Sequence, residues 1–565
     1  MKERMIHKAV ALLYAWTLLC ALPGNALSGS SLPLQPGKWL PMILIGVAGI
    51  MMAMVNRPKV NTLIGWYGVL VLWCIVVDVG WSNCSCESVA WLATCGLFVV
   101  GICSLKATRR FLVLTLCLCT LLCAAMKVAV YLQIIPSSFS LFDNEAGYAA
   151  AFVLGLPAVF YLFHTQKKQA IFLLIITLMG VALTRSRTAW LACLLVSAYW
   201  CKSTFFPLLK FRKWHGVLAG TVLLLAFVAL WMVRPASAIG RWYIDLISCK
   251  LIMSHPLTGL GHCGFYRAYM NAQADYFSMQ ATDTPFAVLA DNTPHAFNEV
   301  LSWSISYGLI GLLFLGFWLW KCLRPVFIDD GRMETHDRMF VRNMLIGAFV
   351  LSMMSYPWTY SYAVLAFLSV MAFLPSSLQW QSRLSCVAQV LAGLFVIISA
   401  GVMATGEYHW RKADEAGMRN DIAAASTHYE RALALLPTRV ELGYNYAADL
   451  NAWGKYAESQ QRLKCLSLQL NDYDTELLVA DNAYHLNQMQ ACQMHLLQAG
   501  RMIPNRFFPL WSRFDLARER KQIKVATQLA GEIMNKPVKV NSAEIMQMKQ
   551  DAQCWLETVR YNQRE

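Results

Sequence analysis

Two arginines and one histidine are the residues of this sequence best suited to chemistry on a charged substrate. They are Arg187, Arg241 and His295, and each lies in or beside an apolar segment. We expect all three on one side of a membrane, opposite the loops that are rich in lysine. Guanidinium groups bind phosphates through paired hydrogen bonds, and cationic groups that line a water-filled mouth at the membrane surface suit an anionic lipid-linked substrate. The pattern predicts binding of a lipid-linked phosphate or diphosphate.

The first motif is LTRSRTAWLA, residues 183–192, which carries Arg185 and Arg187. We expect a tight external turn between two spans here. An arginine at a membrane surface is commonly only an anchor among the lipid headgroups. Positive residues are disfavoured on the external side, however, and an anionic ligand would explain their presence there. Both arginines are therefore candidates for contact with substrate.

The second motif covers residues 240–270 and begins with Arg241, which we expect to open an amphipathic helix ending at His255 and Pro256. A glycine-rich turn follows, and glycine allows a ligand to approach the backbone closely. Gly261 in this turn is a candidate for substrate binding, although most such turns are structural. Because no strand precedes it, the turn is not a dinucleotide-binding fingerprint.

The third motif, residues 292–316, contains His295, Asn298 and Glu299 where the long external segment returns to the membrane. Pro294 is suited to the start of a helix, which would place His295 and Asn298 on one face. Glu299 would then lie one turn after His295 and could orient the imidazole. A lone histidine at a membrane surface is more often structural than catalytic. No second histidine or cysteine stands at a metal-ligand spacing, so no metal is expected.

A fourth candidate is Asn144, in the sequence SLFDNEAGYAAAFVLGLP at 140–157. Asp143, Asn144 and Glu145 are expected at the external start of a membrane helix. Short polar side chains cap helices well, and capping alone explains these residues. Binding of substrate by Asn144 is the alternative.

The composition is that of an integral membrane protein. Of the 565 residues 57% are hydrophobic and 14% charged, whereas a soluble protein carries about 25% charge. A membrane crossing needs roughly 17 to 25 apolar residues. We therefore expect an all-α, polytopic membrane helical bundle of about 12–13 spans. The predicted spans lie near 9–27, 39–55, 62–80, 88–105, 111–132, 146–163, 170–184, 187–201, 215–233, 298–320, 340–356, 359–374 and 384–405.

Basic residues predict the orientation of this bundle. Loops 81–87 and 133–145 contain no lysine or arginine, whereas the alternate loops are rich in both. Because positive loops stay in the cytoplasm, the N-terminus is expected inside, and the loop 234–297 and the C-terminal part outside. The formal net charge of +15 reflects this orientation, and nucleic acid is not an expected partner. The first apolar run resembles a signal peptide but is interpreted as an uncleaved span.

The last part of the chain, 406–565, is interpreted as a soluble α-helical repeat domain that follows a membrane domain at 1–405. The run AAASTHYERALALLP at 423–437 is typical of the second helix of a tetratricopeptide repeat and its turn proline. Pro437, Pro504 and Pro537 recur at about two repeats and one repeat of about 34 residues. A plain helical bundle is the alternative.

The order of these motifs resembles the O-antigen ligase and polymerase superfamily of bacterial membrane glycosyltransferases, of the GT-C type. The matching pieces are FDNEAGYAA, TRSRTAWLA, GRWYIDLISCKLIMSHPLTGLGHCGF and PHAFNEVLSWSISYGLIG, in that order over about 140–315. The stretch MIPNRFFPLWSRFDLAR, with NKPVKVNS, is similar to repeat-bearing members from Bacteroidetes-type bacteria.

The resemblance implies transfer of a glycan from undecaprenyl diphosphate to an acceptor on the periplasmic face of the bacterial inner membrane. The acceptor would be lipid A core, another glycan or a protein hydroxyl. Arg187 and Arg241 would bind the diphosphate, and His295 would be the catalytic histidine. In one departure, Phe297 stands directly before Asn298, where family members often have histidine. Apart from donor, acceptor and membrane lipids, no partner or cofactor is expected.

The chemistry implied is consistent with the residues. Arginine forks can stabilise the charge that develops on a departing diphosphate without a metal, and His295 could accept the acceptor's proton. Attack opposite the diphosphate would invert the anomeric carbon. Alternatives are a protein O-oligosaccharyltransferase, a polysaccharide transporter or flippase, and a non-catalytic scaffold. A transporter would be expected to have inverted repeats and charged residues within its spans. Lys127 is the main charged residue within a predicted span of this chain.

Overall fold

The computed structural model describes residues 2–22, 32–55, 60–81, 86–105, 108–136, 140–206, 235–279, 284–328, 331–375, 379–380 and 383–562. Within these ranges nearly every regular element is a helix, which confirms the predicted all-α class. The two strands described, β1 (Val60–Asn61) and β2 (Gln379–Trp380), pair antiparallel over two residues. The predicted span 215–233 lies outside the described residues.

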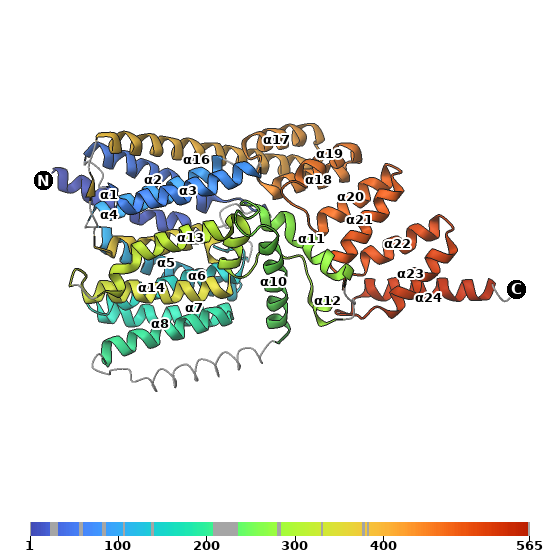
Figure 1. Cartoon of the computed structure of the whole chain (residues 1–565), viewed down its shortest axis with the longest axis horizontal. Coiled ribbons are helices and arrows are strands. Elements are labelled where there is room, and N and C mark those ends of the chain that lie inside the picture. The colour runs from blue at the N-terminus through green and yellow to red at the C-terminus, as the bar shows by residue number, and fades with distance from the viewer. Residues whose placement is uncertain are drawn as a thin grey trace.

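Most of the first 418 residues form a bundle whose helices run side by side in Figure 1. Seven of the described helices are long and apolar enough to cross a membrane, and three shorter apolar helices accompany them. Every predicted span except 215–233 coincides with a helix, so the chain is a multi-pass membrane protein. The bundle consists of α1 (Lys2–Ala21), α2 (Pro36–Val55), α3 (Thr62–Gly80), α4 (Cys86–Ser104), α5 (Thr108–Tyr131), α6 (Glu145–Leu162), α7 (Lys167–Thr184), α8 (Arg187–Phe205), α13 (Glu299–Phe327), α14 (Thr335–Met354), η2 (Pro357–Thr359), α15 (Ser361–Leu368), η3 (Ser369–Phe373) and α16 (Arg383–Met418).

Helix α6 is the most enclosed of these candidate spans, with 83% of its window buried. It is rich in alanine and glycine, and small residues allow helix backbones to approach closely. A Cβ added at Gly155 would lie 2.0 Å from the hydroxyl oxygen of Thr120 on α5, so glycine is needed there. At the start of α6 the side chain of Asn144 accepts hydrogen bonds from the N–H groups of Ala146 and Gly147. The predicted cap is confirmed.

Helix α13 is interrupted at Gly308, whose φ of 68° is rarely adopted by other residues. The segment 256–261 packs into this interruption, and the N–H of Gly261 donates to the carbonyl of Ser306 at 2.8 Å. A Cβ on Gly308 would lie 2.1 Å from the carbonyl oxygen of Leu257. The glycines of the predicted turn therefore allow one backbone to pack against another.

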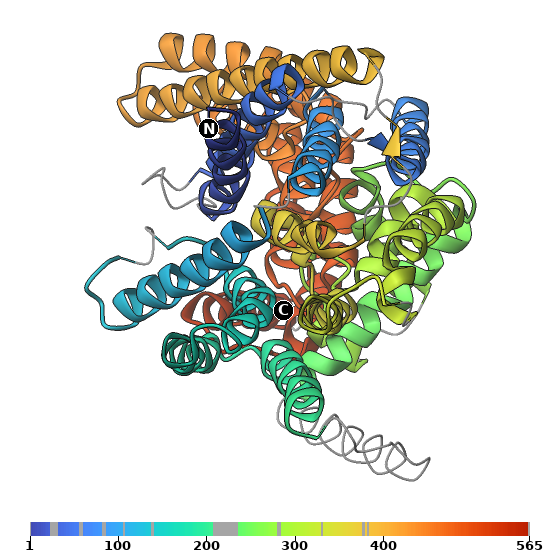
Figure 2. The same cartoon turned by 90° about the vertical axis from the view of Figure 1, so that its left-hand side faces the viewer.

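Between α8 and α13 the structure describes three helices, which lie at one end of the bundle, and α10 crosses that end (Figure 1). They are α10 (Pro235–Ser254), α11 (Gly264–Met279) and α12 (Pro285–Leu289). The C-terminal helices extend from the same end, and they lie behind the bundle in Figure 2. These are α17 (Ile422–Leu435), α18 (Val440–Ala452), α19 (Tyr456–Leu466), α20 (Tyr473–His485), α21 (Met489–Met502), α22 (Phe508–Glu519), α23 (Ile523–Asn535) and α24 (Ala543–Asn562).

The C-terminal helices follow one another as stacked hairpins, which is the arrangement a helical repeat requires. Pro437, Pro504 and Pro537 each lie in a connection between two helices, as their spacing predicted. Helix α16 continues from the bundle to Met418, past the boundary expected near residue 405. The tetratricopeptide type of the repeat and the domain boundary stay predictions.

A buried ionic cluster joins the C-terminal helices to the bundle. The guanidinium of Arg439, with only 6% of its side chain exposed, contacts Glu87 on α4 at 3.1 Å and Glu407 on α16 at 3.4 Å. Glu87 also pairs with Lys38 at 2.7 Å. Burial lowers the pKa of Arg439, but the two carboxylates outweigh this effect and raise it. Arg439 is therefore a charged contact between the two parts of the chain.

We expect Arg439→Met to destabilise the protein by about 3–5 kcal/mol, because it leaves buried carboxylates without their cation. Thermal unfolding of the detergent-purified protein measures the change. The control is Arg462→Met, which removes an exposed ion pair with Glu430 in the same domain and should cost at most about 1 kcal/mol. Equal melting temperatures for the two variants would contradict the expectation.

Candidate functional site

The predicted turn between two spans is present, and it presents both arginines of the first motif. Helix α7 ends at Thr184 and α8 begins at Arg187, so two residues connect them. Arg185 caps α7 in the left-handed conformation, with φ 50°. Arg187 donates a hydrogen bond from Nη2 to the hydroxyl of Ser237 on α10 at 3.0 Å. This contact brings the α7–α8 turn against the start of α10.

Arg241 lies on the same part of α10 as the partner of Arg187. Ser237 and Arg241 are four residues apart, which places them on one face of the helix. Arg241 Nη1 donates to the carbonyl of Met354 at 2.8 Å, at the end of α14. The expectation that Arg241 opens its helix is wrong, because α10 already begins at Pro235. Its place in the second turn directs it toward α14.

The loop that carries His295 differs from its prediction. No helix starts at Pro294, because Asn298 accepts hydrogen bonds from the N–H groups of Val300 and Leu301 and so fixes the start of α13. His295 and Asn298 therefore do not share a helical face. Residue 297, directly before this cap, has a φ of 54°. His295 therefore lies in an extended loop before α13, and its side chain does not project from a helix.

Tyr356 connects the loop to the rest of the site. The imidazole of His295 stacks on its ring at 4.1 Å between centroids, and Phe297 contacts the same ring edge-on at 5.2 Å. The guanidinium of Arg241 lies over the ring of Phe297 at 5.3 Å. The arginine, the histidine and the tyrosine are thus held together through aromatic contacts.

Asn144 reaches this cluster from α6. Its amide nitrogen donates to the hydroxyl of Tyr356 at 3.1 Å, and its oxygen accepts a hydrogen bond from Tyr360 at 2.7 Å. Sequence reasoning missed Tyr356 and Tyr360. The available signal was a pair of tyrosines four residues apart around a proline, at the junction of the predicted spans 340–356 and 359–374. Such a pattern marks no function by itself.

Glu299 and Gly261 make contacts within the protein that the sequence did not predict. The carboxylate of Glu299 accepts a hydrogen bond from the N–H of Trp358 at 3.1 Å, and among the described residues it makes no hydrogen bond to His295. It thereby supports the turn that follows Tyr356. Gly261 packs against α13, and its backbone hydrogen bonds within the described ranges are to Ser306 and Gly264. Whether either residue contacts substrate stays a prediction.

The electrostatic character of the site is set by burial. Burial lowers the pKa of His295 to about 4, so its imidazole is neutral near pH 7. Burial also lowers the pKa of Arg241, and the nearby charge of Arg187 lowers it further. Asp245, one turn after Arg241, has its pKa raised to about 6 by burial. An anion placed here would meet two guanidinium groups and a neutral imidazole that can accept a proton.

Metal ligands do not gather at this site or elsewhere in the ranges that the structure describes. No group of three or more histidine, cysteine, aspartate or glutamate side chains is arranged to hold a metal there. The two arginines therefore stand as the main cationic groups of the site. Metal independence of the chemistry stays a prediction.

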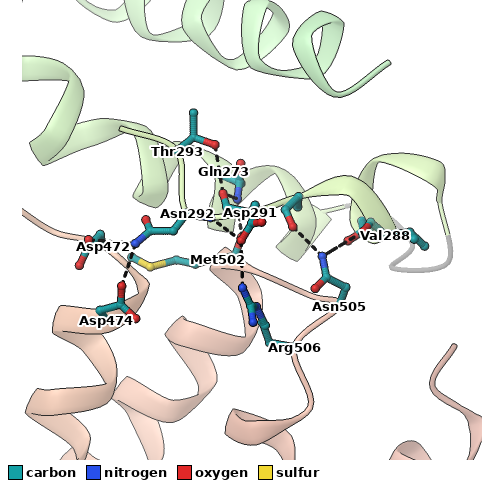
Figure 3. Close-up of polar contacts among 12 residues, drawn as sticks. Gln273, Val288, Asp291, Asn292, Thr293, Asp472, Asp474, Met502, Asn505 and Arg506 are labelled. Carbon is teal, nitrogen blue, oxygen red and sulfur yellow. Dashed lines mark hydrogen bonds and ion pairs between the residues drawn. The ribbon is translucent and has the colours of Figure 1, made fainter. Parts of the chain in front are cut away.

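The C-terminal helices hold the loop that leads to His295 (Figure 3). Asn505 Nδ2 donates to the carbonyls of residues 287, 288 and 290, at 3.3, 3.1 and 2.5 Å. Asn292 Nδ2 contacts carboxylates of both Asp472 and Asp474 at 3.1 Å. Gln273 on α11 donates to the carbonyl of Met502 at 2.6 Å. The C-terminal helices therefore hold the loop before Asp291 through Asn505 and after Asp291 through the carboxylates that bind Asn292.

We expect Asn505→Ala to loosen this loop, because three carbonyls lose their hydrogen-bond donor and such a loss costs about 1–3 kcal/mol. Activity should fall several-fold as a result. Hydrogen–deuterium exchange of residues 284–298 measures the loosening. Arg506→Ala is the control, since it removes an exposed ion pair with Asp291 in the same interface. Unchanged exchange in the Asn505 variant would show that the loop is held in another way.

These features define a polytopic all-α membrane protein with a cationic site at the end of the bundle that bears the helical domain. Residues 171–316 match the model of the O-antigen ligase family. This match, over part of the chain, supports a place in the O-antigen ligase superfamily and a glycan-transfer role in the biosynthesis of surface polysaccharide. The matched segment contains Arg187, Arg241 and His295 but neither Asn144 nor Tyr356. A search of curated proteins found no match to the chain.

Proposed function

We propose that this protein transfers a glycan from undecaprenyl diphosphate to an acceptor hydroxyl at the periplasmic face of the bacterial inner membrane. The observation that carries the proposal is that Arg187 bonds to Ser237 on the face of α10 that also bears Arg241, and that Arg241 is linked through aromatic contacts to the neutral imidazole of His295. Two arginines suit a diphosphate, and a neutral histidine suits removal of a proton from a hydroxyl.

The reaction would proceed by a single displacement. The acceptor oxygen attacks the anomeric carbon and forms the new glycosidic bond, while the bond from that carbon to the diphosphate oxygen breaks. The diphosphate departs with the electron pair, and Arg187 and Arg241 stabilise the added negative charge. His295 takes the proton of the acceptor hydroxyl. Attack from the side opposite the leaving group inverts the anomeric carbon, and no step requires a metal.

The topology supports an external site. The α7–α8 turn, the start of α6 and the start of α13 lie at the end of the bundle from which the C-terminal helices extend (Figure 1). Helix α7 begins with Lys167 and Lys168, and this start lies at the other end of the bundle. Because positive loops stay in the cytoplasm, the site and the C-terminal helices are assigned to the periplasm.

A transporter is less well supported by the charges inside the bundle. Lys127, the main charged residue expected within a span, forms an ion pair with Glu145 at the start of α6. Its position beside the capped helix end gives it a structural role at the membrane surface. A substrate pathway would instead need charged groups near the middle of the spans.

The test compares glycan profiles of cells that lack the protein, complemented with wild type, Arg187→Ala, Arg241→Ala or His295→Ala. Each variant is first shown to reach the membrane at normal abundance. We expect a surface glycan or glycoprotein ladder to disappear, lipid-linked precursor to accumulate, and none of the variants to restore the ladder. The missing product identifies lipid A core, glycan or protein as the acceptor. Restoration by all three variants would reject the proposed site.

A further inference from the structure

A pocket lies at the junction of the loop that leads to His295 and the C-terminal helices, apart from the arginine and histidine site. Its volume is about 680 Å³, within the range of about 300–1,000 Å³ usual for ligand pockets. One wall is formed by Ala287 and Val288, and the others come from α21, α22, α23 and their connections. The pocket therefore forms only where the C-terminal helices meet the loop.

Cations outnumber anions around this pocket. Arg501, Arg513 and Lys536 line it, and Glu532 is the acidic residue among the lining side chains. Within the described ranges, Arg501 and Arg513 have no hydrogen bond or ion pair that would occupy their guanidinium groups. Two unoccupied arginine forks in one pocket are suited to a carboxylate or phosphate, which each can bind through two hydrogen bonds.

The remaining lining is a mixture of apolar and amide side chains. Leu496, Pro504 and Leu510 provide apolar surface, and Asn535 provides a polar side chain. The C–H faces of sugar rings pack on apolar surface, while their hydroxyls need polar partners. A lining of this kind, with two arginines, suits a sugar that carries a negative charge.

We propose that this pocket binds an anionic saccharide, as a segment of the acceptor glycan. The saccharide identity rests on the proposed glycan transfer, whereas the negative charge follows from Arg501, Arg513 and Lys536 alone. Asn505 lines the pocket and also holds the loop that leads to His295. A ligand bound here would therefore rest on the same segment that positions the catalytic histidine.

Lys536 gives the binding a pH dependence. Burial lowers its pKa to about 8, with a partial offset from Glu532, and its ammonium donates to the carbonyl of Arg506 at 2.6 Å. The group is mostly charged at pH 7 and loses its proton as the pH rises above about 8. Binding of an anion should therefore weaken between pH 7 and pH 9.

The experiment measures binding of small probes to the full-length protein in detergent, by isothermal titration calorimetry. The probes are trigalacturonate, the neutral trisaccharide maltotriose and the acidic peptide triglutamate. We expect wild type to bind trigalacturonate and to bind the other two at least tenfold more weakly. Because no turnover is needed, failure here leaves the test of glycan transfer unaffected.

Two variants separate loss of charge from loss of space. Arg501→Ala combined with Arg513→Ala should weaken trigalacturonate binding about 100-fold, since two charged hydrogen-bonding groups are lost. Gly531→Phe should block the pocket with all charges retained, because a Cβ at Gly531 meets no atom within 4 Å and the site has room for a side chain. Arg518→Ala is the control, since Arg518 lies on α22 outside the pocket and pairs with Asp515.

Binding of trigalacturonate by wild type and by the variants distinguishes the possible results. Loss of binding in the double variant and in Gly531→Phe, with normal binding by Arg518→Ala and unchanged melting temperatures, supports it. Equal or tighter binding of triglutamate would show a site for acidic peptide and overturn the saccharide assignment. Absence of trigalacturonate binding to wild type, or binding that survives in Gly531→Phe, would overturn the proposal as a whole.

Discussion

Arg241→Ala is expected to lower the rate of glycan transfer by about 100- to 1,000-fold, the usual loss when one group that stabilises developing charge is removed. Arg241 is held by the carbonyl of Met354 and by the ring of Phe297, so its guanidinium is fixed before a substrate binds. A fixed charge needs no rearrangement as the diphosphate departs. The measurement is a single-turnover rate with purified protein and a lipid-diphosphate-linked glycan.

Arg241→Lys separates charge from geometry. Lysine retains the charge, but it cannot offer the planar pair of donors that matches a phosphate, so we expect it to recover only a small part of the lost rate. The matched control is Lys250→Ala, which removes a cation from the same helix beside Tyr276 and should transfer glycan as wild type does. If Arg241→Ala retained more than about a third of the wild-type rate, Arg241 would be a structural residue. A loss of about threefold in rate is far smaller than the loss expected when a contact to the transition state is removed.

The turn that carries Arg185 and Arg187 and the helix cap at Asn144 could be predicted because their signals are local. Arg185 and Arg187 lie between two apolar segments of the sequence, and the structure places them in the two-residue turn and at the first position of α8. Asn144 precedes an alanine-rich span, and it caps that helix as the short-range pattern predicts. Long apolar segments likewise identified the helices of the bundle without information from the rest of the chain.

Contacts between distant segments could not be predicted in this way. Tyr356 joins Asn144, 212 residues earlier, to His295, and no spacing in the sequence records such a contact. Asn505 donates hydrogen bonds to the loop that leads to His295, more than 200 residues earlier in the chain. Each depends on how the helices pack, which local propensity does not determine.

The helix predicted to start at Pro294 and to carry His295 is wrong for a specific physical reason. Two residues in this motif are able to start a helix, Pro294 at its first position and Asn298 at its cap. Asn298 prevails because its side chain satisfies two N–H groups of α13, whereas proline only removes a donor. Glu299 is consequently the first residue of the helix, and its carboxylate is directed to the turn at Trp358.

His295→Ala is expected to lower the rate of transfer by about 100- to 10,000-fold, the range for loss of a general base. The pH profile of the wild type identifies the group. Burial lowers the pKa of His295 to about 4, so kcat/KM, which reports the free enzyme, should be independent of its ionisation from pH 5 to pH 8. An exposed histidine, with a pKa of about 6.5, would instead make kcat/KM fall about tenfold by pH 5.5.

Binding of the donor should raise the pKa of His295. A diphosphate near His295 favours the charged imidazolium and raises its pKa, so the acid limb of kcat should lie at higher pH than that of kcat/KM. A higher pKa in the complex also makes the imidazole a stronger base when the acceptor proton must be removed. His295→Gln is the control variant, since it retains hydrogen bonding without a group that titrates. If this variant kept both the wild-type rate and the same acid limb, another group would be the base, and His295 would serve only to pack against Tyr356.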